Sequence, residues 1–257
     1  MLNCFDLVGE TAIVTGAAKG LGRVFAKALA KAGADIYLMG RGEAGLQETA
    51  NQVISIGRQC FWRYVDITNQ KEVVDCIGDC IDRFGKIDIL INNAGAPRLN
   101  ISPEETTLEQ WKQVLDVNIS GSFLCAQAAG REMIRRKKGK IVNLASISGF
   151  IINKGVHGGS YDVSKSAVVG MTKALAAEWA QHNINVNAIA PGYFLTDPNI
   201  KFFKEDPEFY KMALSLIPAK RIGDPRELEG AVVFLSSKAS NYMHGSTLII
   251  DGGYTVW

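Results

Sequence analysis

Short apolar runs alternate with amphipathic stretches along almost the whole chain, and this alternation limits the fold more than any other feature. Runs typical of strands occur at Thr11–Thr15, Asp35–Met39, Cys60–Val65, Ile87–Ile91, Lys140–Leu144, Ile184–Ile189 and Leu248–Ile250. Stretches with helical periodicity occur at Leu21–Ala32, Glu43–Ile56, Lys71–Phe84, Leu108–Lys137, Tyr161–Ala180 and Pro225–Leu235. Such alternation over short connections predicts right-handed βαβ units and a parallel sheet with helices on both faces. We therefore expect one α/β domain over residues 1–257, a doubly wound Rossmann fold with seven parallel strands.

The composition excludes several classes of protein. With 257 residues the chain can bury a sizeable core, and its net charge of +2 gives no reason to expect nucleic acid as a partner. No apolar run reaches the roughly 18 residues of a membrane span, and the first residues do not resemble a signal peptide. The five cysteines are scattered, and no cysteine or histidine cluster has metal-ligand spacing. We expect a cytoplasmic protein with reduced thiols and no metal site.

One segment breaks the alternation of strands and helices. Asn199–Pro218 follows the sixth predicted strand and is rich in aromatic and methionine side chains. Doubly wound proteins bind their ligands beyond the carboxyl ends of the strands, so a segment at this place is suited to cover a substrate. We expect a lid over residues 193–218, and the alternative is a pair of helices packed on the core.

A glycine-rich turn joins the first predicted strand to the first predicted helix. It reads Thr15-Gly16-Ala17-Ala18-Lys19-Gly20-Leu21-Gly22. Glycines permit a tight turn and close approach of the backbone to a pyrophosphate, which then lies on the N-terminus of the helix. At this position the turn predicts a dinucleotide-binding site.

The second predicted strand indicates which dinucleotide binds. NAD-binding folds usually carry a carboxylate at the tip of this strand, whereas the strand here ends Leu38-Met39-Gly40-Arg41. Arg41 can pair with a 2′-phosphate, and Lys19 can approach the same group. Glu43 is close enough in sequence to reach a ribose hydroxyl instead. We expect NADP(H), with NAD(H) as the alternative.

A tyrosine and a lysine stand four residues apart in Tyr161-Asp162-Val163-Ser164-Lys165. Four residues make about one helical turn, so the phenol and the ammonium lie on one face of the predicted helix. A tyrosine has an ordinary pKa of about 10, and a nearby cation favours its ionised form. The pair is therefore suited to general acid/base catalysis.

Taken together, these features resemble the short-chain dehydrogenase/reductase family from the first strand to the last. The family's motifs are matched in order by Thr15, Gly16, Gly20 and Gly22; Asp66; Asn92-Asn93-Ala94-Gly95; Asn118; Ser146; Tyr161 and Lys165; Pro191-Gly192 with Thr196; and Asp251-Gly252-Gly253. Many motifs in one order are far more specific than any single motif. The resemblance implies an active, NADP(H)-preferring oxidoreductase that acts on CH–OH groups.

The resemblance also implies a role for each matched residue. In oxidation Tyr161, as phenolate, takes the hydroxyl proton while hydride passes to the nicotinamide, and in reduction it returns a proton. Lys165 lowers the pKa of the phenol and binds the nicotinamide ribose, Ser146 holds the substrate oxygen, and Asn118 positions a water. The residues expected to contact the cofactor are Gly16, Lys19, Gly20, Leu21, Gly22, Arg41, Asp66, Ile67, Asn93, Ala94, Gly95, Tyr161, Lys165, Pro191, Gly192, Phe194 and Thr196.

Two serines compete for the role of holding the substrate oxygen. Ser148 has the commoner spacing to Tyr161, but Ser146 opens the Ser-x-x-Gly motif of the family. We expect Ser146 to be the active serine, with the extra residues placed in Gly155–Gly159. Apart from Ser146 and Tyr161, the candidates for contact with a polar substrate are Ser148, Asn153, Lys154 and His157.

The substrate is indicated by resemblance alone. The regions Pro218–Arg221 and Tyr254–Trp257 look most like gluconate 5-dehydrogenases and related sugar-acid and polyol dehydrogenases. The first alternative is a 3-oxoacyl-[acyl-carrier-protein] reductase, in which Arg135–Lys138 would dock the acidic carrier. Those cations equally suit the C-terminus of a helix. The second alternative is a regulator that senses NADP without turnover.

The family also indicates an assembly. Relatives are commonly tetramers that pair the helices near Leu108–Lys137 and Tyr161–Ala180, and the apolar Tyr254–Trp257 suits an interface. We expect a homotetramer that acts on a small molecule, with no nucleic-acid or membrane partner.

Overall fold

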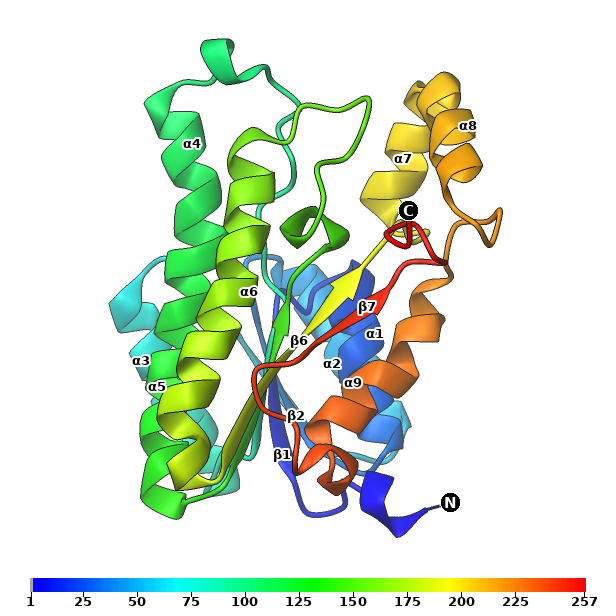
Figure 1. Ribbon diagram of the computed structural model, residues 1–257. Helices are drawn as coiled ribbons and strands as arrows, with labels where there is room; N and C mark the ends of the chain where they lie inside the picture. Colours follow the sequence, from blue (N-terminus) through cyan, green and yellow to red (C-terminus); the bar gives the residue numbers. More distant parts are fainter. Residues whose placement is uncertain (1) are drawn as a thin grey trace.

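The centre of the protein is a parallel sheet whose strands all end at one edge. The computed structural model describes residues 2–257 and is shown in Figure 1. The strands are β1 (Thr11–Thr15), β2 (Asp35–Gly40), β3 (Cys60–Tyr64), β4 (Ile89–Asn92), β5 (Gly139–Leu144), β6 (Ile184–Pro191) and β7 (Thr247–Ile250). Their order is β3-β2-β1-β4-β5-β6-β7, and every neighbouring pair is parallel. The predicted seven-stranded, doubly wound sheet is confirmed.

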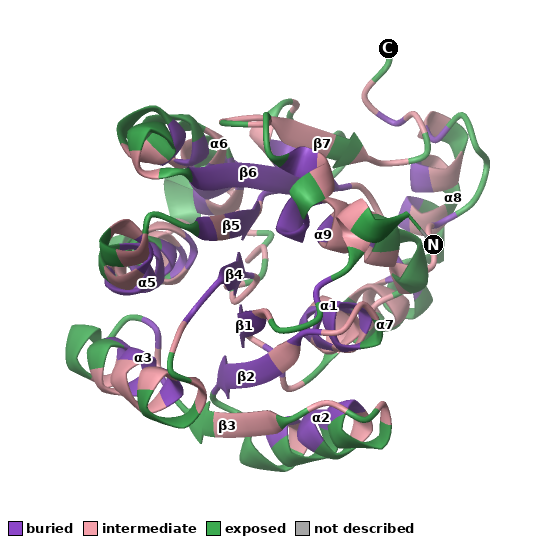
Figure 2. Ribbon diagram, turned by 90° about the horizontal axis from the view of Figure 1, so that it is seen from below, coloured by how far each residue is buried: buried purple, intermediate pink, exposed green. Residues whose placement is uncertain are grey.

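Helices cover both faces of the sheet (Figure 2). One face carries α1 (Gly20–Lys31), α2 (Glu43–Ser55) and α9 (Glu229–Ser236), and the other carries α3 (Gln70–Phe84), α5 (Ser122–Arg136) and α6 (Gly159–Trp179). Each face has its own large apolar cluster, because the central strands are buried on both sides. This double burial explains the continuous apolar runs in the sequence.

The prediction of one continuous helix over Leu108–Lys137 is wrong, because the helix is interrupted in its middle. The structure has α4 (Leu108–Leu115), a π-helical turn at Asp116–Gly121, and then α5. Within the π turn the Asn118 side chain is buried and accepts a hydrogen bond from the Ala96 amide at 2.7 Å. A π turn adds a residue to the helix and re-aims its side chains, and such turns are frequent at functional sites.

The aromatic segment after β6 forms two helices, α7 (Asp197–Glu205) and α8 (Pro207–Leu216). They stand beyond the carboxyl end of β6, near the C-terminus (Figure 1). Phe203 and Phe209 are buried in a separate apolar cluster there, 6.4 Å apart between ring centroids. A Cβ on Gly155 would lie 2.4 Å from Cε of Met212, so the loop before α6 packs tightly on α8. The pair thus has its own small core rather than joining the main one.

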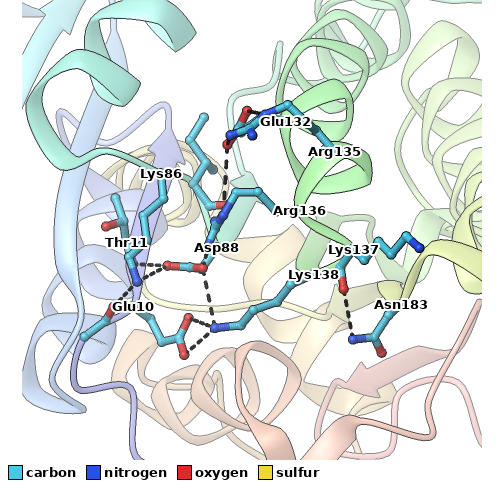
Figure 3. A network of polar contacts seen from close by, with 12 residues as sticks. Glu10, Thr11, Lys86, Asp88, Glu132, Arg135, Arg136, Lys137, Lys138 and Asn183 are labelled. Atoms are coloured by element: carbon cyan, nitrogen blue, oxygen red, sulfur yellow. Dashed lines mark hydrogen bonds and ion pairs between the residues drawn. The ribbon is translucent and has the colours of Figure 1, made fainter.

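A network of charges surrounds Asp88 at the amino end of β4 (Figure 3). The Asp88 carboxylate is 1% exposed, accepts from the Thr11 amide at 3.0 Å, and pairs with Lys86 at 3.0 Å and Arg136 at 3.1 Å. Lys138 pairs with Glu10 at 2.7 Å and lies 3.5 Å from Asp88. Burial acts to raise the pKa of Asp88, but the Thr11 amide and the nearby cations outweigh burial and hold the pKa below its ordinary value.

Replacing Asp88 by Asn should destabilise the fold by about 2 kcal/mol, because the Thr11 amide and the partly exposed Lys86 and Arg136 would lose a buried charged acceptor. A depressed carboxyl pKa contributes stability above the unfolded pKa of about 3.9 and loses it as pH falls through the folded pKa. Urea unfolding should therefore show that the difference in free energy of unfolding between the variant and wild type is smaller at acid pH than at pH 7.

Asp75→Asn is the matched control, because the Lys71–Asp75 pair is exposed and worth at most about 1 kcal/mol. Equal destabilisation by the two variants at pH 7 would contradict the role assigned to burial.

Candidate active site

A groove opens along the carboxyl ends of β1, β2, β3 and β4, where the strand order reverses between β1 and β4. Its volume is about 790 Å³. Doubly wound proteins bind dinucleotides at this topological switch point. Residues of the predicted cofactor set that line it are Gly16, Lys19, Gly20, Leu21, Arg41, Asp66, Ile67, Asn93, Ala94, Gly95 and Thr196. Predicted cofactor residues from five separate segments therefore meet in one groove.

The glycine turn is held tightly against the end of β4. Gly16 has φ +65°, which favours glycine, and a Cβ there would lie 2.8 Å from Cα of Ala94. The Thr15 hydroxyl accepts from the amides of Asn93 and Ala94 at 3.0 and 2.9 Å. The Asn93 side-chain amide donates to the carbonyl oxygen of Thr15 at 2.9 Å. Asn93 thus anchors the turn, and this anchoring is a structural role that the motif alone did not reveal.

Gly22 does not line the groove, although it belongs to the predicted cofactor set. A Cβ at this position would lie 2.4 Å from the carbonyl oxygen of Gly16 and 2.6 Å from Nδ2 of Asn93. The absence of a side chain lets the first turn of α1 pack on the glycine turn. The N-terminus of α1 is then directed at the groove, where its free amides suit a phosphate.

Arg41, the basic residue noted in the sequence, lies at the tip of β2. Arg41 has a side chain 65% exposed, and its Nη1 lies 3.5 Å from Asp66. The Asp66 carboxylate accepts from the amide and hydroxyl of Thr68 at 3.0 and 2.8 Å. The Thr68 amide is the main reason that the pKa of Asp66 lies below its ordinary value, and Arg41 adds to it. Lys19 and Glu43 are both exposed.

Five further residues of the predicted cofactor set lie outside the groove lining, namely Tyr161, Lys165, Pro191, Gly192 and Phe194. Pro191 ends β6, and Gly192 is packed so closely on Asp251 that a Cβ would lie 2.7 Å from Cβ of Asp251. Phe194 is buried against Gly223. Pro191, Gly192 and Phe194 shape the chain that leads into α7.

Tyr161 and Lys165 lie at the start of α6, as predicted. Nζ of Lys165 is 5.6 Å from the centre of the Tyr161 ring and donates to the carbonyl oxygen of Leu144 at 2.8 Å. Lys165 is only 6% exposed. Burial lowers the pKa of Lys165 to about 8.

The pKa of Tyr161 differs from the expectation. Burial raises it above its ordinary value, while a hydrogen bond with Ser146 and the charge of Arg98 act in the opposite direction. The Lys165 ammonium donates to a backbone carbonyl, and its expected lowering of the phenol pKa stays a prediction. The sequence spacing could not include burial, which is the largest influence on this phenol.

The two candidate serines have different surroundings. Ser146 is the one whose hydrogen bond acts on Tyr161. The Ser148 hydroxyl is buried and accepts from Asn153 at 2.7 Å and from Arg98 at 2.9 Å. Ser148 and Asn153 thus form a polar wall beside Ser146, and the choice of Ser146 as the active serine stays a prediction.

His157 lies apart from that polar wall. Its side chain is exposed and lines a surface hollow with Pro103 and Ile152, a hollow that Asp162 also lines. Its backbone amide donates to Asn100 at 2.8 Å. Lys154 is exposed as well. The structure thus brings Ser146, Ser148 and Asn153 together and leaves His157 out.

The Asn118 side chain completes the cluster from the π turn. Its Nδ2 donates to the Ser164 hydroxyl at 2.8 Å. A Cβ on Gly95 would meet Oδ1 of Asn118 at 3.1 Å and Nζ of Lys165 at 3.8 Å, so all three groups converge at one point.

Two charged residues in the site were missed by the sequence analysis. Nη2 of Arg98 pairs with Oδ1 of Asp162 at 2.6 Å, and the side chains are 18% and 5% exposed. The guanidinium lies 5.0 Å from the centre of the Tyr161 ring. A signal was available, because Arg98 follows the Asn92–Gly95 motif by three residues and Asp162 adjoins Tyr161.

Among residues 2–257 no helix is long and apolar enough to cross a membrane. Within the same residues no group of three or more acidic, histidine or cysteine side chains could hold a metal ion.

Comparisons with known proteins cover nearly the whole chain. A family model described as "Enoyl-(Acyl carrier protein) reductase" matches residues 16–255. The chain is 41% identical to a 2-dehydro-3-deoxy-D-gluconate 5-dehydrogenase of Dickeya dadantii, over 99% of this chain and 98% of that protein. It is 40% identical to a galactitol 2-dehydrogenase (L-tagatose-forming) of Cereibacter sphaeroides, over 98% of each.

A solved structure extends the similarity to three dimensions. The structure of a gluconate 5-dehydrogenase from Burkholderia cenocepacia in complex with NADP and tartrate has a TM-score of 0.94 and 36% identity. It covers 100% of this chain and 99% of that one.

Replacing Gly22 by Ala should weaken binding of NADPH at least about tenfold, since the new methyl group would push the glycine turn off α1. Fluorescence titration of NADPH measures the loss. Gly78→Ala on α3, where a Cβ would meet nothing within 4 Å, is the matched control and should bind NADPH as wild type does. Wild-type affinity in the Gly22 variant would contradict this account of the turn.

Proposed function

The chain belongs to the short-chain dehydrogenase/reductase family and is an NAD(P)-dependent oxidoreductase of secondary alcohols and ketones; on this premise we propose that its substrate is a sugar acid or a polyol. The observation that carries the proposal is the polar wall beside Tyr161, where Ser148 and Asn153 are buried and hydrogen-bonded. A substrate with several hydroxyl groups can exchange hydrogen bonds with these polar side chains, whereas an aliphatic alcohol cannot. The named relatives act on sugar acids and a hexitol, which supports the same class.

We propose that Tyr161 is the general acid/base. In oxidation its phenolate accepts the hydroxyl proton of the substrate, and in reduction its phenol donates a proton to the forming alkoxide. The hydride leaves or joins the same carbon, and the nicotinamide supplies or accepts it when bound. Ser146, which hydrogen-bonds Tyr161, holds the substrate oxygen beside the phenol. Lys165 binds the nicotinamide ribose, and Asn118 supports the cluster through Ser164.

The groove fits a nicotinamide dinucleotide. The glycine turn presents backbone where a Cβ would collide, and the N-terminus of α1 offers amides to the pyrophosphate. We propose that NADP(H) is preferred, because Arg41 is exposed at the tip of β2 and the strand's last residues, Leu38–Gly40, carry no carboxylate. The NADP in the similar Burkholderia structure supports this choice.

We propose that residues 193–218 act as a lid of the single domain, 1–257. The α7–α8 pair has its own aromatic core and contacts the loop before α6 through Met212 and Gly155. A unit with a separate core can move as a body when substrate enters. We also propose that the protein is a cytoplasmic homotetramer that acts on a small molecule, because members of the family are commonly tetramers.

The carrier-protein alternative has less support. Arg136 and Lys138 are engaged with Asp88 and Glu10, and Arg135 pairs with Glu132 at 2.7 Å (Figure 3). This network lies at the amino end of β4, whereas the site lies at the carboxyl ends of the strands. A carrier docked there would hold its acyl group on the wrong edge of the sheet. A regulator that senses NADP without turnover would not need the acid/base cluster of Tyr161, Lys165 and Ser146, so this alternative has less support as well.

Replacing Tyr161 by Phe should lower kcat/KM by about 10²–10⁴-fold, because the variant lacks the proton donor. The Kd for NADPH should stay near wild type. The assay follows NADPH oxidation with 5-ketogluconate, a panel of sugar ketones and an acetoacetyl thioester. Turnover of the thioester alone would favour the reductase of carrier-bound substrates, and tight binding without any turnover would favour the regulator. Retained activity in the variant would remove Tyr161 from its role.

Replacing Arg41 by Ser should raise the KM for NADP at least about tenfold and change the KM for NAD little, since only NADP carries the 2′-phosphate. Initial rates with both cofactors measure the ratio. Arg131→Ser, on the exposed face of α5, is the control for loss of one surface arginine. An equal effect on both cofactors would count against a 2′-phosphate contact.

A further inference from the structure

A buried ion pair lies beside Tyr161 and Ser148, two of the residues proposed to contact the substrate. Arg98 comes from the segment after β4, and Asp162 comes from the first turn of α6. Their closest atoms, Nη2 and Oδ1, are 2.6 Å apart, and the two side chains are 18% and 5% exposed. Charges this far from solvent interact strongly, so each largely cancels the field of the other.

The pair adjoins the reacting groups. The Arg98 guanidinium lies 5.0 Å from the centre of the Tyr161 ring and donates to the Ser148 hydroxyl at 2.9 Å. Asn153 donates to the same hydroxyl at 2.7 Å and accepts from the Tyr193 phenol at 3.4 Å. A substrate held by Ser148 and Asn153 would therefore lie beside the ion pair.

Gly158 leaves room for the Arg98–Asp162 pair because it has no side chain. A Cβ on Gly158 would lie 1.6 Å from Oδ2 of Asp162 and 2.9 Å from Nη1 of Arg98. Neither of these two atoms has a hydrogen-bond partner among residues 2–257. Asp162 and Arg98 thus fill the space that any side chain at Gly158 would need, so the loop before α6 is built around them.

The ion pair determines how the site interacts with a charged group of the substrate. Arg98 is the cation in this wall that a sugar carboxylate would seek, but Asp162 already neutralises it. The other cation over the Tyr161 ring is Lys165, whose ammonium donates to Leu144, and Lys154 is exposed. A bound carboxylate would lose its hydration, meet no free cation and be repelled by Asp162. A hydroxymethyl group in the same place carries none of these costs.

We propose that Asp162, by neutralising Arg98, makes the pocket select an uncharged polyol or ketose over a sugar acid. The inference rests on the proposed function and narrows it. The similar proteins include a galactitol dehydrogenase and sugar-acid dehydrogenases, so similarity leaves this choice open.

The test compares substrates that differ only at one end. Each pair is a hexitol and the aldonate of the same configuration, such as galactitol with galactonate and glucitol with gluconate. The kcat/KM for NADP-dependent oxidation of the hexitol, divided by that for the aldonate, gives the selectivity. Wild type should favour the hexitol at least tenfold. Asp162→Asn and Asp162→Ser should each lower the selectivity at least tenfold, because Arg98 becomes a free cation.

Glu178→Gln removes one carboxylate from the exposed far end of α6 and is the matched control, with selectivity within twofold of wild type. A wild type that prefers the aldonate would overturn the inference, whether or not the variants fold. So would Asp162 variants that bind NADPH normally and keep the wild-type selectivity. Wild-type protein that turns over neither member of any pair would instead contradict the proposed function.

Discussion

Parallel pairing of all seven strands is the constraint on which the rest of the structure depends. It brings the carboxyl end of every strand to one edge, so loops that are far apart in sequence share one space. Thr15 at the end of β1 and Asn93 after β4 hydrogen-bond across the switch point and fix the glycine turn there. The groove, the acid/base cluster and the α7–α8 pair all lie beyond this edge.

The two edges of the sheet differ in how completely their buried charges are compensated. At the amino end, Asp88 is surrounded by an amide and cations, and its charge is fully compensated. At the carboxyl end, Lys165 is buried with a carbonyl as its partner, and Arg98 and Asp162 keep polar atoms without partners. The first arrangement serves stability, and the second places a neutralised ion pair and a buried ammonium beside the acid/base cluster.

Much of the fold and part of the site could be predicted from local pattern. Buried strands appear as apolar runs, and a glycine turn needs its backbone whatever surrounds it, so both leave a mark in the sequence. The π turn at Asp116–Gly121 leaves none, because it depends on the bond from the Ala96 amide to Asn118. The pairing of Arg98 with Asp162 could not be predicted, since the two lie 64 residues apart on different elements, although the position of Arg98 after the Asn92–Gly95 motif was a signal.

The sequence by itself determined the order of strands and helices, the place of the glycine turn and the spacing of Tyr161 and Lys165, because each is set by neighbours along the chain. Only the tertiary structure decided how those groups ionise and what they face. Burial raises the pKa of Tyr161 and lowers that of Lys165, and the packing of α6 against the segment after β4 sets Asp162 on Arg98. Burial and long-range pairing depend on which segments meet in space, and spacing along the chain does not record this.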